Sequence, residues 1–160
     1  MNNTCHDSLI DALTQFEQSM AQLYVIFGRL FPSESCRWAD LAAEECRQAQ
    51  WLANFKIYLR NEIICQSETD IVIRRVNLTL EFIENQIRRA ASNNIDLREA
   101  ILVALVIEDS AFESSFLLTF NFKTPKVRKI RRKLIEATGI QKDKLVMWLD
   151  HIEGRMKMVA

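Results

Sequence analysis

Three stretches of the chain repeat apolar residues in alternating steps of three and four, and each of these stripes contains one glutamate. The first stripe consists of Ile10, Leu13, Glu17, Met20, Tyr24 and Phe27. The second consists of Trp38, Leu41, Glu45, Gln48, Leu52, Phe55 and Leu59. The third consists of Leu97, Ile101, Ala104, Glu108, Ala111, Ser115 and Leu118. This spacing is typical of helix faces that are buried against other helices.

A carboxylate in the middle of a buried stripe is costly unless another group compensates its charge. Glu17, Glu45 and Glu108 each lie near the middle of a stripe. Together they predict a polar cluster inside a helix bundle. Two alternatives stay open at this point: the glutamates reach solvent from the edges of their stripes, or they hold a metal ion.

Short breaks divide the chain into five expected helical segments, at about 5–30, 34–63, 68–91, 97–120 and 125–156. Asp96 followed by Glu99 resembles a capping box, and Ser67 and Thr124 are expected to precede helices as caps. Gly139 is expected to kink or split the last segment. The segment 68–91 fits either a fifth helix or a structured crossover along a four-helix core.

Composition supports one all-α domain that spans residues 1–160. Glycine (3) and proline (2) are too scarce for a turn-rich β fold among 160 residues. The chain lacks an apolar run of the roughly 18–20 residues that a membrane span needs, and its first residues do not resemble a secretory signal. We therefore expect a cytoplasmic protein without a membrane partner, whose four cysteines are reduced, Cys46 being half-buried.

Several short motifs resemble the ferritin-like superfamily, and its rubrerythrin-like branch in particular. The motifs are Glu17-x-x-x-Ala21-x-x-Tyr24, Leu41-Ala42-Ala43-Glu44-Glu45-x-x-Gln48-Ala49 and Ala104-x-x-x-Glu108. The resemblance implies an antiparallel four-helix bundle with an additional helical segment. It also implies a di-iron site, with Glu17, Glu45 and Glu108 as ligands and Tyr24 nearby.

The chain departs from this family at the remaining ligand positions. Such bundles supply one Glu from each of two helices and a Glu-x-x-His pair from each of the other two. Here Gln48 replaces the histidine of the second helix, and the best match in the last helix is Gln141-Lys142-Asp143-Lys144. An amide is a poor ligand and a protonated lysine is none. We therefore interpret the site as vestigial or weak.

Lys144 suggests how such a site would be neutralised without metal. If its ammonium points inward, it offsets part of the carboxylate charge, while Gln48 and Gln141 donate hydrogen bonds to the glutamates. At least one glutamate is then expected to hold a proton.

The start of the last helix carries six basic residues between Lys126 and Lys133. They fit a solvated face of an amphipathic helix or a docking surface for an acidic protein or nucleic acid. The segment lacks aromatic residues of its own, and the net charge of the chain is zero, which argues against nucleic acid. Met147, Met156 and Met158 suggest an apolar edge for a homodimer.

These observations favour a non-enzymatic role in structure or in interaction with an unidentified protein, with no cofactor. The alternative is a rubrerythrin-like metalloprotein that binds iron or manganese and acts as a di-metal carboxylate oxidoreductase or stores metal. No nucleophile elbow, phosphate-binding glycine loop or dinucleotide fingerprint is present in the sequence.

Overall fold

The computed structural model describes residues 3–59, 66–110 and 124–159, and every secondary-structure element within these ranges is a helix. Its α-helices are α1 (Asn3–Leu30), α2 (Ser35–Leu59), α3 (Gln66–Ala91), α4 (Leu97–Ser110) and α6 (Pro125–Val159). A short 3₁₀ helix, η1 (Pro32–Glu34), joins α1 to α2. The prediction of an all-α fold is confirmed. None of these helices is both long enough and apolar enough to cross a membrane.

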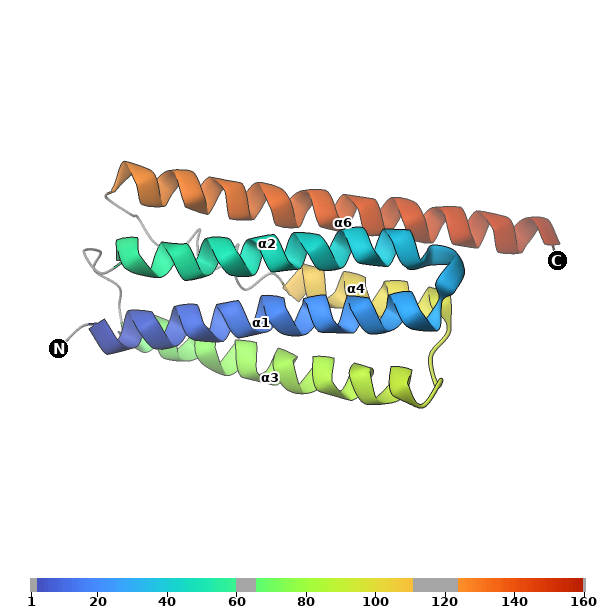
Figure 1. Cartoon of the computed structure of the whole chain (residues 1–160), viewed down its shortest axis with the longest axis horizontal. Helices are drawn as coiled ribbons and strands as arrows, with labels where there is room; N and C mark the ends of the chain where they lie inside the picture. The colour runs from blue at the N-terminus through green and yellow to red at the C-terminus, as the bar shows by residue number, and fades with distance from the viewer. Residues whose placement is uncertain (1–2, 60–65, 111–123, 160) are drawn as a thin grey trace.

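The helices lie side by side along one long axis (Figure 1). Helices α1, α3 and α6 run in one direction, and α2 and α4 run in the other. Helix α1 packs against α2 and α3, while α6 packs against α4 and α2. Helix α3 thus runs the length of the molecule between the end of α2 and the start of α4. Both sequence interpretations of this segment, a fifth helix and a structured crossover, agree with this arrangement.

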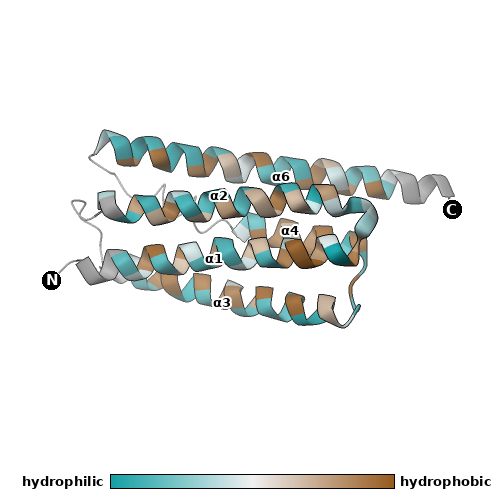
Figure 2. Ribbon diagram, viewed as in Figure 1, coloured by the Kyte–Doolittle hydropathy of each residue, from teal (hydrophilic) through white to brown (hydrophobic). Residues whose placement is uncertain are grey.

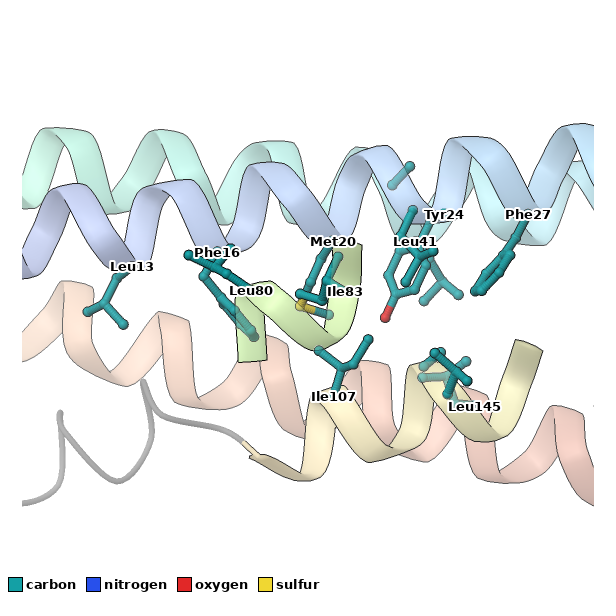
Figure 3. Close-up of a cluster of buried hydrophobic side chains, with 14 of the residues drawn as sticks. Leu13, Phe16, Met20, Tyr24, Phe27, Leu41, Leu80, Ile83, Ile107 and Leu145 are labelled. Carbon is teal, nitrogen blue, oxygen red and sulfur yellow. The ribbon is translucent and has the colours of Figure 1, made fainter. Parts of the chain in front are cut away.

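The apolar stripes form the shared core, and polar residues alternate with them along every helix (Figure 2). All described side chains of the first two stripes are buried. This core contains Leu13, Met20 and Phe27 from α1, Ile107 from α4 and Leu145 from α6 (Figure 3). In the third stripe Ile101, Ala104 and Glu108 are buried, whereas its last three residues lie outside the described ranges.

The ends of α3 and α4 follow the local signals in the sequence. Asn93 adopts a positive φ of 53° after the end of α3. The amides of Asn93 and Asn94 bond the carbonyls of Ala90 and Arg89, which is the hydrogen-bond pattern of a Schellman motif. Asp96 caps α4 by accepting a 2.8 Å hydrogen bond from the amide of Glu99.

Three expectations about helix boundaries and one about burial were wrong. The Glu99 side chain does not bond back to Asp96 but pairs with Arg89 at 2.6 Å, which ties the end of α3 to the start of α4. Ser67 lies inside α3, which begins at Gln66. Gly139 neither splits nor interrupts α6, because the helix continues through it. Cys46 is exposed rather than half-buried.

Replacing Gly139 with alanine is expected to stabilise the protein by about 0.5–1 kcal/mol, because glycine in a helix interior carries an entropic cost. No described atom lies within 4 Å of the place that the new Cβ would occupy. Urea unfolding would measure the gain. Gly28→Ala is the control without such a gain, because its Cβ would stand 3.3 Å from the Cβ of Trp38. A loss of stability in Gly139→Ala would contradict the continuous helix.

Candidate functional site

The three predicted glutamates come together in the interior of the bundle. Glu17 from α1 and Glu45 from α2 are each 1% exposed, and Glu108 from α4 is 5% exposed. All three line one cavity of about 10 Å³. The interpretation that these glutamates reach solvent at the edges of their stripes is therefore wrong, and the prediction of a buried polar cluster is confirmed.

The cavity has a polar lining and an apolar lining. The polar side chains are Glu17, Glu45, Gln48, Glu108 and Thr138. The apolar side chains are Phe16, Met20 and Ile107. The described lining includes no lysine, arginine or histidine. A space of this size accommodates about one water molecule.

A chain of hydrogen bonds connects α2 and α6 beside this cavity. The Gln141 amide donates to Glu45 Oε1 at 2.5 Å. Its carbonyl oxygen accepts a hydrogen bond from the Gln48 amide, also at 2.5 Å. The Thr138 hydroxyl lies 3.5 Å from Gln48 Oε1 and bonds the Leu134 carbonyl within its own helix at 3.2 Å. The expected role of Gln141 as a donor to a glutamate is confirmed, whereas Gln48 donates to Gln141 instead.

Tyr24 provides the second polar connection, between α1 and α4. Its hydroxyl points from α1 toward α4 (Figure 3) and donates a 3.1 Å hydrogen bond to Glu108 Oε1. The centre of the Tyr24 ring lies 5.6 Å from the centre of the Trp38 ring. The Trp38 ring centre in turn lies 4.7 Å from that of Trp148 in α6. This aromatic cluster holds the phenol in place beside the carboxylate.

The environment of Tyr24 strongly favours its neutral form. Burial raises the pKa of its hydroxyl well above the ordinary value of 10.0. The negative charges of Glu108, Glu45 and Glu17 raise this pKa further. Tyr24 therefore remains a hydrogen-bond donor to Glu108.

Lys144 lies outside the polar cluster, so the expectation that it points inward was wrong. Its side chain is exposed and lines a separate surface hollow of about 430 Å³, together with Arg37, Trp148 and His151. The stripe of α6 continues instead from Gln141 to Leu145 and Trp148, which are both buried. The Lys144 ammonium therefore does not neutralise the carboxylates.

Thr138 is the polar residue of this cavity that the sequence interpretation missed. It is 8% exposed and lies three residues before Gln141, so both side chains occupy one face of α6. Extending the apolar stripe of the last helix back through Gly139, to Leu134 and Val127, would have found it. The expected break at Gly139 concealed this continuity.

Among the described residues, no three histidine, cysteine, aspartate and glutamate side chains are arranged to hold a metal ion. The amides of Gln48 and Gln141 bond each other beside the cavity.

No protein-family model, curated protein or solved structure matches the chain.

Replacing Gln141 with leucine is expected to destabilise the fold by about 2–4 kcal/mol, because Glu45 and Gln48 each lose a buried partner. The matched control on the same helix is Lys144→Met, which should change stability by no more than about 0.5 kcal/mol because Lys144 is exposed. Urea unfolding of both variants gives the comparison. Equal effects at the two positions would contradict the hydrogen-bonded cluster.

The raised pKa of Tyr24 predicts a specific loss of stability at high pH. Above pH 10.0 the unfolded chain releases the Tyr24 proton while the folded chain keeps it. The stabilisation is therefore complete below this pH and falls by about 1.4 kcal/mol per pH unit above it. The difference in unfolding free energy between the parent and Tyr24→Phe should shrink between about pH 10 and pH 11. A constant difference over this range would contradict the burial of the phenol.

Proposed function

We propose that the protein is a ferritin-like helical bundle that has lost its di-metal centre and serves a non-enzymatic role in structure or interaction. The observation that carries this proposal is the bond between Gln48 and Gln141, together with the bond from Gln141 to Glu45. These amides satisfy buried polar groups within the chain, where a metalloprotein needs ligands that are available to a metal ion.

The order of the helices supports the ferritin-like part of the proposal. Helices α1 and α6 run in one direction, α2 and α4 run in the other, and α3 returns along the length of the bundle between α2 and α4 (Figure 1). Ferritin-like bundles have one long crossover connection of this kind. Helix α3 would be that crossover in helical form.

The spacing of the polar residues supports the loss of a metal centre. In α2, Glu45 and Gln48 form a pair three residues apart, and in α6 the corresponding pair is Thr138 and Gln141. Glu17 and Glu108 would be the single glutamates of the other two helices. On this reading Gln48 and Gln141 stand where histidines would bind, and Thr138 stands in place of a glutamate.

The chemistry of the residues that remain does not fit a di-iron site. Such a site would need two imidazoles and a fourth carboxylate, whereas the chain supplies two amides and one hydroxyl. Neutral amides and hydroxyls bind iron weakly. We therefore assign no redox step to these residues and attribute to them the packing of four helices around a polar centre.

The second candidate is a metalloprotein that binds iron or manganese through Glu17, Glu45 and Glu108, with oxidase, peroxidase or storage activity. The observation that favours it is that these three carboxylates line one cavity. Hard cations prefer carboxylate oxygen ligands.

Elemental analysis of the untagged protein, before and after anaerobic incubation with ferrous iron or manganous ion, separates the two candidates. We expect no retained metal in either preparation, since the amides are already bonded to each other and to Glu45. About two metal ions per chain, lost on Glu17→Gln or Glu108→Gln, would overturn the proposed function.

A gain of metal binding would test the assigned ligand positions. The triple variant Gln48→His, Thr138→Glu and Gln141→His restores the full set of four glutamates and two histidines. It should retain metal that the parent does not. The control variant carries Gln48→His, Gln141→Glu and Lys144→His. It should not retain metal, because the side chain at position 144 is exposed. Equal metal retention by the two variants would show that the assigned positions are wrong.

A further inference from the structure

The first turns of α6 concentrate positive charge on an otherwise acidic molecule. Six of the 21 basic residues lie between Lys126 and Lys133, and this segment contains no acidic residue. The remaining 152 residues carry 15 basic and 21 acidic side chains. The zero net charge of the chain therefore conceals a strongly basic surface region at one end of the bundle.

This charge is unfavourable for the helix that carries it. The N-terminus of a helix has a partial positive charge, so acidic residues stabilise it and basic residues do not. The first turn of α6 contains no acidic residue. Basic residues three and four positions apart also repel one another along the helix. Arg128, Lys129 and Arg132 are exposed and form no ion pair with the described acidic residues.

Aromatic rings from α2 lie directly beside this basic region. The Lys126 ammonium stands 4.1 Å from the centre of the Tyr58 ring. The Lys133 ammonium stands 5.8 Å from the Trp51 ring. Trp51 and Tyr58 are seven residues apart in α2, and Lys126 and Lys133 are seven residues apart in α6. The two contacts therefore follow one another along the line where α2 and α6 meet. Both rings are only partly buried.

These four side chains, with Asn54 and Ile130, line a surface hollow of about 270 Å³. Aromatic faces beside lysine and arginine side chains are the combination that binds single strands of nucleic acid, because bases stack on the rings and phosphates approach the cations. A double-stranded partner or an acidic peptide gives no comparable reason for two part-exposed rings beside the lysines.

We propose that the hollow lined by Trp51, Tyr58, Lys126 and Lys133, together with the basic start of α6, binds single-stranded nucleic acid. The inference rests on the proposed interaction role and names the class of its partner. It is independent of the buried polar cluster, because none of the residues of this hollow lines the internal cavity.

Fluorescence anisotropy with labelled single-stranded DNA and RNA of about 15 nucleotides tests the proposal with the full chain. The logarithm of the binding constant should fall with the logarithm of the salt concentration. The double variant Lys126→Gln/Lys133→Gln should bind more weakly, and its salt slope should be smaller by about 0.7 for each lysine that contacts a phosphate. The control, Lys142→Gln/Lys144→Gln, removes the same charge from the middle of α6, where Lys142 pairs with Asp109, and should bind as the parent does.

Substitution of Trp51 separates stacking from charge, because it would not change binding to a purely electrostatic surface. Trp51→Leu should weaken binding roughly 5- to 100-fold, whereas Trp51→Phe keeps a stacking face and should retain most of it. Circular dichroism would verify that each variant keeps its helices.

Three results would overturn the proposal: no binding to either oligonucleotide, equal loss in the lysine control, or binding that is indifferent to Trp51→Leu. Poly-glutamate and vesicles of anionic lipid serve as competitors. If either binds as tightly as the oligonucleotides, the region recognises acidic protein or membrane surface instead. If the protein is metal-free and does not bind the oligonucleotides, the proposed function stands and the partner is of another class. Retained metal would refute the proposed function whatever the result with the oligonucleotides.

Discussion

Burying a carboxylate costs several kcal/mol unless hydrogen bonds or opposite charge compensate it, and this chain buries three around one cavity of about 10 Å³. Two neutral donors contribute to this compensation: Tyr24 bonds Glu108, and Gln141 bonds Glu45. Because these donors come from different helices than their acceptors, each bond fixes the rotation of one helix relative to another. The polar centre thereby sets the register in which α1, α2, α4 and α6 pack.

The period of the stripes made much of the site predictable, because it fixes which face of a helix is buried. Glu17, Glu45, Gln48 and Glu108 were placed correctly on this basis, and Tyr24 and Gln141 with them. Lys144 was placed wrongly because both Thr138 and Lys144 lie three residues from Gln141. Only the continuous stripe through Leu134, Gln141 and Leu145 decides between them, and the expected break at Gly139 hid it. That a glutamate holds a proton stays a prediction.

The surface beside α6 could not be predicted from local pattern. The basic segment has no aromatic residue of its own, and this absence argued against nucleic acid as a partner. In the structure Trp51 and Tyr58 come from α2, about 70 to 80 residues earlier in the sequence, and meet Lys133 and Lys126 because α2 and α6 run antiparallel. Such a pairing depends on the topology and on the rotation of both helices, which hydrophobic periodicity alone does not determine.

The most direct test of the polar centre is a crystal structure of the protein soaked in manganous ion, with anomalous diffraction data. We predict that the amides of Gln48 and Gln141 remain bonded to each other and that no anomalous peak lies among the three glutamates. A strong peak within coordination distance of Glu17, Glu45 and Glu108, with the amides turned away from each other, would contradict the account.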